Sequence, residues 1–351
     1  MESRVLDVEG WEKVVHFTDK ESQLEAIISV HNSNLGSGLG GCRVRKYDSF
    51  DDGLNDVKRL SRGMTYKNAL GHIPFGGGKA VVFADPYSEK TPEMMQAMGR
   101  AIESLNGLYV SAQDSGVTTD DIREMRKNTK NAAGVEDEQG RGGNPSPFTA
   151  YGVWKGMKAA AAHKLGTDNL EGVRVSILGL GAVGMALADH LHGEGAKLIV
   201  ADINEKALAI ARDKYGAEIV SPDGAAAQDV EVFAPCALGG SVNETSIETI
   251  KAKIIAGAAN NQLLRPGYDG VLREKGILYA PDYVINAGGV ISIGHEFLGD
   301  WNKDKLYGAL DNIADVLTQI FQRADAEDRP TGIIADKLAE EIFLVDSQAA
   351  S

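Results

Sequence analysis

Apolar and β-branched residues occur in short runs along the first third of the chain, separated by polar or glycine-containing turns. Apolar residues recur at three- and four-residue spacing from Leu54 to Met64, which predicts a helix over residues 50–71. A second helix is expected to open at Thr91, a cap residue followed by proline, and a third near Thr119. The runs that predict strands are EKVVHF (12–17), LEAIISVH (24–31), GCRVRKY (41–47), KAVVFA (79–84) and LYVSAQD (108–114).

The second part of the chain begins with a helical pattern over residues 149–166 and then alternates between strand and helix patterns. Such alternation predicts a parallel sheet with helices on both faces. From Trp301 the pattern is helical and ends in DKLAEEIFLVDSQ (336–348). The strand-type runs are VRVSILGLG (173–181), AKLIVAD (196–202), AEIV (217–220), VEVFAPC (230–236), AKIIAGA (252–258) and GILYAPDYVINAGG (276–289).

The clearest loop in the first half is GVEDEQGRGGNPSP (134–147), which is rich in glycine, proline and polar residues and lacks periodicity. We place a domain boundary there. The sequence therefore predicts an α/β protein of two domains separated by a cleft: an N-terminal α/β domain over residues 1–133 and a doubly wound domain over residues 134–327. A C-terminal helix within 328–351 is expected to pack back on the first domain.

Composition narrows the function classes. The chain has 351 residues, 43% hydrophobic and 25% charged, as in an ordinary globular protein. A formal net charge of -14 argues against a nucleic-acid or anionic-membrane partner. Two isolated cysteines, Cys42 and Cys236, and scattered histidines indicate neither a disulfide framework nor a metal site. The N-terminus lacks a signal-type apolar core, and no stretch approaches the ~20 apolar residues of a membrane span, so we expect a cytoplasmic protein.

The segment MTYKNALGHIPFGGGKA (64–80) contains three glycines before Lys79 and resembles a phosphate-binding loop. That motif requires a glycine five residues before Gly78 and a Ser or Thr after the lysine, but the chain has Ile73 and Ala80 there. The nucleotide site must therefore lie elsewhere.

A better candidate is Gly179-x-Gly181-x-x-Gly184, which follows a predicted strand and begins a helix. With the next strand and Asp202 at its end, it matches the dinucleotide fingerprint of Rossmann-type domains. Asp202 is expected to bind the ribose hydroxyls and to repel a 2′-phosphate, and the next basic residue is Lys206, which favours NAD over NADP.

Two lysines stand out in the first domain. Lys67 falls on the apolar face of its predicted helix, where a lysine must meet an anion or lose its charge. Lys79 opens a buried strand after glycines that let a ligand or another backbone approach. A desolvated lysine beside another cation has a lowered pKa and acts as a base near neutral pH. One lysine is thus expected to bind a carboxylate and the other to move a proton.

Eight segments of the chain, taken in order, resemble those of the Glu/Leu/Phe/Val amino-acid dehydrogenases. The likeness runs from about residue 10 to about residue 345. The likeness is strongest to the leucine-specific members. The motifs that carry it are GLGGCR (38–43), MTYKNALGHIPFGGGKA (64–80), AQDSG around Asp114, NPSPFTAYG (144–152), GLGAVG (179–184), APCALGG (234–240), AGAANNQL (256–263) and YAPDYVINAGG (279–289).

The resemblance implies reversible, NAD-dependent oxidative deamination of an L-amino acid to a 2-oxo acid and ammonia. It implies that Lys67 binds the substrate α-carboxylate, that Lys79 is the general base for water attack, and that Asp114 exchanges protons with the amino group. The amides of Asn260, Asn261 and Asn286, with Thr149, would position the nicotinamide. The implied cofactor contacts are Gly179, Gly181, Ala182, Val183, Gly184, Asp202, Ile203, Thr149, Ala237, Asn260 and Asn286.

The resemblance also implies which residues surround the substrate side chain. Glutamate enzymes carry a lysine at Leu39 and a hydroxyl at Ile293, so a glutamate here would bury an unpaired charge. Ala133 replaces a threonine of leucine enzymes, which widens the pocket and keeps phenylalanine or tryptophan as alternative substrates. The implied substrate contacts are Lys67, Leu39, Gly40, Met64, Ala112, Ala133, Asn261, Val290 and Ile293.

Two further expectations concern assembly and activity. Leucine dehydrogenases that form octamers continue past the last helix, whereas this chain stops at QAAS, so a homodimer is expected. The remaining alternative function is that of a non-catalytic NAD-binding homologue. Such a homologue would be expected to lack Lys67, Lys79 or Asp114, and all three are present.

Overall fold

A computed structural model describes residues 1–136, 142–299 and 301–344. The chain divides into two compact units, which are described separately. The first unit contains Met1–Pro145, Val290–Leu306 and the chain from Ala339 onward, and the second contains Ser146–Gly289 and Tyr307–Leu338.

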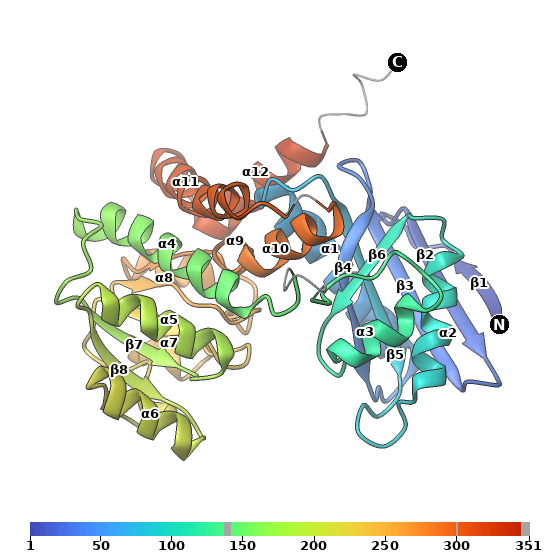
Figure 1. The fold of residues 1–351 in the computed structure, drawn as a ribbon. Helices are drawn as coiled ribbons and strands as arrows, with labels where there is room; N and C mark the ends of the chain where they lie inside the picture. The colour runs from blue at the N-terminus through green and yellow to red at the C-terminus, as the bar shows by residue number, and fades with distance from the viewer. Residues whose placement is uncertain (137–141, 300, 345–351) are drawn as a thin grey trace. The chain divides into compact units, whose positions relative to one another are not determined.

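The first unit is built on a mixed sheet in the order β1-β2-β3-β5-β4-β6 (Figure 1). Strands β1, β2, β3 and β5 pair antiparallel in turn, and β4 lies parallel between β5 and β6. The parallel strands bring the chain segments that follow them to one edge. The strands are β1 (Glu2–Leu6), β2 (Lys13–Asp19), β3 (Leu24–Asn32), β4 (Gly38–Arg45), β5 (Gly76–Phe83) and β6 (Tyr109–Gln113).

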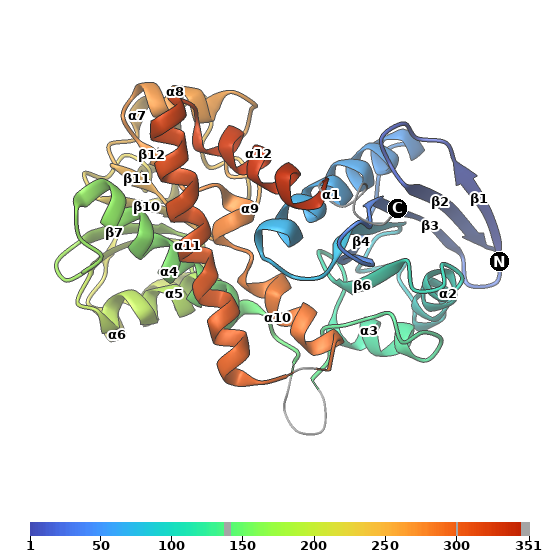
Figure 2. The same cartoon turned by 90° about the horizontal axis from the view of Figure 1, so that it is seen from above.

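Helices cover both faces of this sheet (Figure 2). Helix α1 (Phe50–Leu70) places Val57 in an apolar cluster with Val14, Ile27 and Val81 on one face. Helices α2 (Pro92–Glu103) and α3 (Thr119–Arg126) contribute to the larger core on the other face.

Hydrogen bonds at the N-termini explain where these helices begin. Ser49 accepts from the Asp52 backbone before α1, and Thr91 accepts from the Met94 backbone before α2. Thr118 forms a capping box before α3. Each cap satisfies backbone donors that have no partner inside the helix.

The second unit contains a parallel sheet in the order β12-β11-β10-β7-β8-β9, which confirms the parallel sheet predicted from the sequence. Three of its strands are only two residues long. The strands are β7 (Arg174–Leu178), β8 (Lys197–Ala201), β9 (Glu218–Ile219), β10 (Val232–Pro235), β11 (Ile254–Ile255) and β12 (Leu278–Tyr279).

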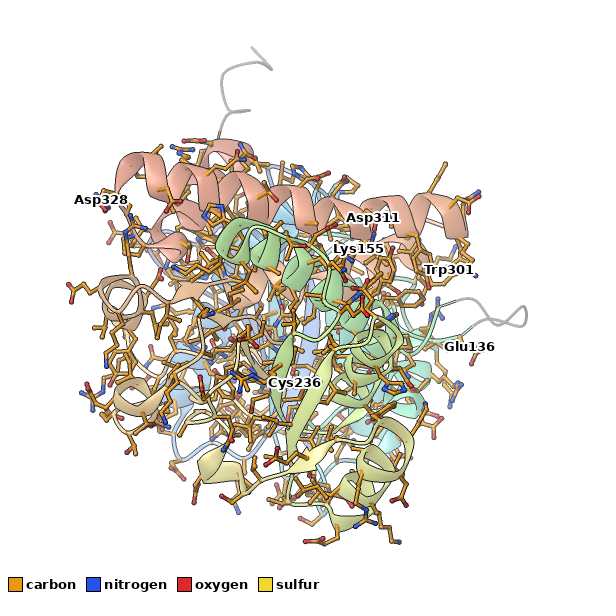
Figure 3. The ribbon with its side chains drawn as sticks, turned by 90° about the vertical axis from the view of Figure 1, so that its left-hand side faces the viewer. Glu136, Lys155, Cys236, Trp301, Asp311 and Asp328 are labelled. Atoms are coloured by element: carbon orange, nitrogen blue, oxygen red, sulfur yellow. The ribbon has the colours of Figure 1, made fainter. Side chains whose placement is uncertain are left out.

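Long helices pack on one another in this unit. Lys155 of α4 and Asp311 of α11 lie side by side in Figure 3, with 2.9 Å between Nζ and Oδ1. The Tyr151 hydroxyl of α4 also donates to Asp311, at 2.8 Å. The remaining helices of the chain are α4 (Ser146–Leu165), α5 (Ala182–Gly193), α6 (Glu205–Tyr215), α7 (Ser246–Thr249), α8 (Tyr268–Glu274), α9 (Asp282–Ile285), α10 (Gly288–Phe297), α11 (Lys303–Glu327) and α12 (Thr331–Phe343). Helix α10 from Val290 and helix α12 from Ala339 belong to the first unit.

Three sequence predictions need correction or completion. The run 276–289 is a strand only at Leu278–Tyr279 and then becomes α9, because Pro281 cannot extend a strand ladder and stands at the N-cap of α9, with Asp282 in its first turn. The edge strand β1 was missed, since its residues are almost all exposed and show no apolar alternation. The predicted C-terminal helix ends at Phe343, and residues 345–348 lie outside the described residues, as do 137–141 of the predicted loop.

Within the described ranges, no helix is long and apolar enough to cross a membrane. The same ranges contain no group of three or more histidine, cysteine or acidic side chains suited to a metal ion.

Candidate active site

The glycines before Lys79 allow main-chain segments to pack closely in the first unit. A Cβ on Gly77 would overlap the Thr65 backbone nitrogen of α1, and one on Gly78 would lie 2.6 Å from the Gly38 carbonyl oxygen. Real Cβ atoms do not approach backbone this closely, so β5 needs glycine to pack against α1 and β4. The glycine run therefore carries Lys79 into the interior, where the residue is only 6% exposed.

The buried end of Lys79 meets Asp114. The lysine Nζ forms an ion pair with Asp114 Oδ2, and the second carboxylate oxygen accepts the Ser115 backbone N–H at 2.6 Å. Asp114 directly follows β6, which pairs with β4, and β4 pairs with β5. Sheet topology thus joins two residues that are 35 positions apart in sequence.

The pKa of Asp114 is set by opposing effects. Burial raises the pKa of this carboxyl. The charges of Lys79 and Arg43, together with hydrogen bonds from Lys79 and the Ser115 backbone, outweigh burial and lower the pKa to about 2. Asp114 is therefore a carboxylate when the site is empty of substrate. The sequence suggests a neighbouring cation for Lys79, and the structure places an anionic partner, Asp114, beside it.

Lys67 lies in the last turn of α1 and is half-buried. The next residue, Asn68, was not predicted from the sequence, although it anchors this turn. Its Nδ2 donates to the Leu39 carbonyl at 3.1 Å and to the Gly76 carbonyl at 2.6 Å. The end of α1 that carries Lys67 is thereby fixed to both β4 and β5.

The residues expected around the substrate side chain lie in the first unit, apart from Asn261, which belongs to the second. Gly40 adjoins Met64, because a Cβ on Gly40 would lie 2.9 Å from Met64 Cγ. Ala133 donates its N–H to the Ser111 carbonyl at 2.8 Å, which places it beside β6. The set is largely apolar and buried: Leu39, Gly40, Ala112, Ala133 and Ile293 are buried, and Met64 and Val290 are half-buried.

A second residue that was not predicted from the sequence is Glu296, at the end of the helix α10 that carries Val290 and Ile293. Its carboxylate accepts the backbone N–H groups of Gly134 at 2.8 Å, Val135 at 3.1 Å and Gly143 at 3.2 Å. It thus ties α10 to the chain that follows Ala133. A glutamate that bonds to distant backbone has the same sequence signal as a solvent-facing one.

In the second unit, the predicted glycine loop forms the turn between β7 and α5. Gly179 has φ 105°, and a Cβ there would lie 2.6 Å from the Ala237 nitrogen. A Cβ on Gly184 would overlap the Gly179 carbonyl oxygen. A Cβ on Gly181, by contrast, would meet no atom of the described residues within 4 Å. The open N-terminus of α5, which includes Ala182 and Val183, fits the pyrophosphate of a dinucleotide.

Asp202 follows β8 and lies against this turn. Its carboxylate accepts the Leu180 N–H at 2.5 Å and the Asn204 N–H at 2.7 Å. The adjacent Ile203 is 91% exposed. The acidic side chain is therefore held beside the glycine turn, where the fingerprint requires it.

The predicted amides of the second unit also meet. Asn286 Nδ2 donates to Asn260 Oδ1 at 2.9 Å and to the Ala258 carbonyl at 3.0 Å. Asn261 adopts φ 52°, and a Cβ on Gly288 would lie 3.1 Å from Thr149 Cα.

The residues that support this loop were not predicted from the sequence. Gln262 is fully buried and donates to the Gly257 and Ala259 carbonyls at 2.8 and 3.1 Å. Asp282 accepts the Gln262 N–H at 2.9 Å.

Two protein-family models match this chain, one mainly in each unit. Residues 12–131 match "Glu/Leu/Phe/Val dehydrogenase, dimerisation domain", and residues 200–339 match "Glutamate/Leucine/Phenylalanine/Valine dehydrogenase". A leucine dehydrogenase from Geobacillus stearothermophilus is 45% identical over 338 residues, which cover 96% of this chain and 92% of that protein. The chain belongs to the Glu/Leu/Phe/Val dehydrogenase family.

Other members of the family extend the match. An L-tryptophan dehydrogenase from Nostoc punctiforme is 41% identical over 333 residues, which cover 95% of this chain and 93% of that protein. A crystal structure of L-tryptophan dehydrogenase from the same organism superposes with a TM-score of 0.84 at 40% identity, covering 95% of this chain and 96% of that one. The resemblance and the two-domain α/β fold predicted from the sequence are both confirmed.

A more distant comparison concerns the fold alone. A hetero-hexameric glutamate dehydrogenase from Thermus thermophilus, in a leucine-bound form, shares the fold with a TM-score of 0.77 at 21% identity, covering 95% of this chain and 88% of that one. Enzymes of the Glu/Leu/Phe/Val family are amino-acid dehydrogenases that use a nicotinamide cofactor.

Proposed function

We propose that this protein is an NAD-dependent dehydrogenase of leucine type, which converts an aliphatic L-amino acid, water and NAD⁺ reversibly into the 2-oxo acid, ammonium, NADH and a proton. The observation that carries the proposal is the buried Lys79–Asp114 ion pair, which joins an acid and a base in the interior of the first unit. The 45% identity to a leucine dehydrogenase supports the aliphatic substrate.

Three residues of the first unit have distinct proposed tasks in the reaction. Lys67, on the anchored end of α1, binds the substrate α-carboxylate through its ammonium group. Asp114 is ionised and accepts a proton from the substrate amino group. Lys79 releases its own proton to solvent and then, as a general base, removes one from the water that attacks the α-carbon of the imino acid. Asp114, protonated by then, returns its proton to the amino nitrogen before ammonia leaves.

A nicotinamide cofactor, when bound, supplies the acceptor for the hydride that leaves the α-carbon. The open turn at Gly181 and the N-terminus of α5 would hold its pyrophosphate. Thr149, Asn260 and Asn286 would orient its nicotinamide amide.

Asp202 supports NAD as the cofactor, because a fixed carboxylate accepts from a ribose hydroxyl and repels a 2′-phosphate. We expect Asp202→Ala to reduce the preference for NAD over NADP by at least about tenfold, the equivalent of ~1.4 kcal/mol. The measurement is kcat/KM for both cofactors with leucine as the substrate. Efficient use of NADP by the unmutated protein would contradict this role.

The main experiment is a panel of the twenty L-amino acids with NAD⁺, followed by the absorbance of NADH. We expect leucine, isoleucine and valine to be oxidised well and glutamate not to be. Lys79→Ala serves as the inactive control. Because Ala133 is small and buried, phenylalanine and tryptophan are the alternative substrates, and a panel led by either would replace leucine in the proposal.

We also propose that the protein is cytoplasmic and forms a homodimer. The match of residues 12–131 to a domain described as a dimerisation domain supports the dimer. Light scattering coupled to size-exclusion chromatography measures the mass directly, and a mass near the 37.4 kDa of one chain would contradict it.

A further inference from the structure

Behind the Lys79–Asp114 pair lies a second layer of charged side chains that the proposed mechanism does not use. Arg43 of β4 extends Nη2 to within 3.5 Å of Asp114 Oδ1 and donates from Nη1 to Asp56 Oδ2 at 2.9 Å. Asp56 lies on α1 and also accepts from the Tyr47 hydroxyl at 2.9 Å. The guanidinium therefore bridges the ionised carboxylate of the site and a carboxylate outside it.

This bridge is largely removed from water. The side chains of Arg43, Asp56 and Asp114 are 18%, 13% and 20% exposed. Nε of Arg43 is buried without a hydrogen-bond partner among the described residues, so its contacts run through the two terminal nitrogens. Taking such charges out of water is unfavourable unless they are well paired. The arrangement is therefore a paired network and not a set of incidental surface contacts.

We propose that Arg43 is a positioning residue for the deamination reaction: Asp56 and Tyr47 orient its guanidinium, which holds the Asp114 carboxylate in place beside Lys79. This role rests on the proposed function, because it assigns Arg43 a task in that reaction. A lysine at position 43 would supply the charge, but its single ammonium group lacks the planar fork that reaches two carboxylates at once.

The other titratable groups near Asp114 do not substitute for Arg43. Burial raises the pKa of Cys42 to about 12 and that of Tyr109 well above 10, so both stay neutral in the working range. Lys90 and Asp121 form an ion pair with each other, at 2.5 Å, and their charges offset one another. Like Arg43, Lys79 forms an ion pair with Asp114, and Lys79 is the group that the reaction itself deprotonates.

Loss of the Arg43 cation has a predictable effect on pH dependence. A nearby positive charge favours the deprotonated form of its neighbours, so its removal raises the apparent pKa of the Lys79–Asp114 pair as a unit. We expect a rise of about one pH unit, the lower end of the range for a charge at this distance. The limb of the kcat/KM profile on which activity rises with pH should move upward by that amount.

The test compares Arg43→Gln with a matched control, Arg59→Gln. Arg59 also donates to Asp56, at 2.9 Å from Oδ1, but its side chain is 55% exposed. Both substitutions remove one cation from Asp56, and only Arg43 reaches Asp114. We expect Arg43→Gln to shift the limb upward by about one pH unit and to lower kcat/KM about tenfold on that limb. Arg59→Gln should leave the limb in place.

Rescue separates charge from geometry. Arg43→Lys should restore most of the limb position but only part of kcat, because it keeps the charge and loses the two-carboxylate bridge. An unchanged limb in Arg43→Gln, or an equal shift in Arg59→Gln, would overturn the positioning role.

A second readout does not depend on activity. In melting curves at pH 7, Arg43→Gln should lower the midpoint by about 1–3 °C more in the wild-type background than in the Asp114→Asn background. Equal effects in both backgrounds would show that Arg43 and Asp114 are not coupled. If the wild type oxidised no amino acid, the proposed function would fail, while this cycle would still report on the link between Arg43 and Asp114.

Discussion

The two units build their candidate sites from different materials. In the first unit the site consists of charged side chains on or directly after separate strands: Lys79 from β5, Asp114 after β6 and Arg43 from β4. In the second unit it consists mainly of backbone, a glycine turn with an open helix N-terminus and a fixed carboxylate at Asp202. The side-chain site is suited to moving protons and the backbone site to holding a phosphate-bearing molecule.

This difference predicts different responses to substitution. A charged network loses function when one functional group is removed, even if the fold persists. A backbone cradle has no functional group to remove and loses function when an added atom occupies the space of its ligand. Substitutions in each unit test this contrast, beginning with the largest expected effect.

Removal of the base should have the largest effect. Lys79→Ala deletes the group assigned to proton transfer, and we expect kcat to fall about 10²–10⁴-fold. NADH binding, followed by fluorescence, should stay within about twofold of the wild type, because the proposed cofactor site lies in the second unit. Turnover above about a tenth of the wild-type value would mean that another residue is the base.

The next prediction concerns the substrate side chain. Ala133 is 1% exposed, and Ala133→Thr adds two heavy atoms next to β6. Overpacking costs ~1–3 kcal/mol, so the ratio of kcat/KM for phenylalanine to that for leucine should fall roughly 5- to 150-fold. The measurement covers leucine, isoleucine, valine and phenylalanine.

The preceding residue, Ala132, offers a matched control. It belongs to the apolar core with residues of α2 and α3, so Ala132→Thr should lower the melting midpoint and leave the ratio of kcat/KM for phenylalanine to that for leucine unchanged. A constant ratio in Ala133→Thr would remove Ala133 from the side-chain site.

The glycine turn offers a contrast of its own. Gly184→Ala would overlap the Gly179 carbonyl oxygen, so the cost should appear as instability, about 1–3 kcal/mol, with or without cofactor. At Gly181 a Cβ meets open space, so Gly181→Ala should fold with an unchanged midpoint and raise the KM for NAD about tenfold. Melting curves and cofactor titrations distinguish the two. Equal stability losses would mean that the turn does not have the described geometry.

A site can be predicted from the sequence when its residues lie close together along the chain. Gly179, Gly181 and Gly184 lie within six residues, and Asp202 follows one βα unit later, so the sequence pattern predicted the glycine turn. Lys79 and Asp114 were found through motifs, and the structure joins them.

The supporting residues were not predictable in this way. Glu296 binds backbone N–H groups 153 to 162 positions earlier, and the Arg43–Asp56 pair joins a strand to a helix. No local pattern distinguishes such a glutamate or arginine from a solvated one. The segment 276–289 was misassigned for a different reason, since Pro281 and Asp282 are a local signal for a helix start that the apolar residues around them obscured.

The smallest expected effect concerns pH and again contrasts the two units. In the first unit, lysine and arginine lower the pKa of Asp114. In the second, burial dominates and raises the pKa of Asp269 from its ordinary 3.8 to about 6, against the hydrogen bonds it accepts from Gly332 and Thr331 at the start of α12. The carboxyl is therefore held in its protonated form in the folded protein over a pH range in which the unfolded chain ionises it.

The sign of the resulting stability change follows from proton counting. Between about pH 4 and pH 6 the folded state binds more protons at Asp269 than the unfolded state, so its contribution to stability falls as pH rises through this window and stays low above it. Asp269→Asn keeps an acceptor for the Gly332 N–H and cannot ionise. We expect the variant to gain about 1–2 kcal/mol relative to the wild type on going from pH 4 to pH 7, measured by urea unfolding at both values. A difference that stays constant, or that grows toward acid as it would for a residue such as Asp114, would mean that Asp269 is ionised in the folded protein and that burial does not control it.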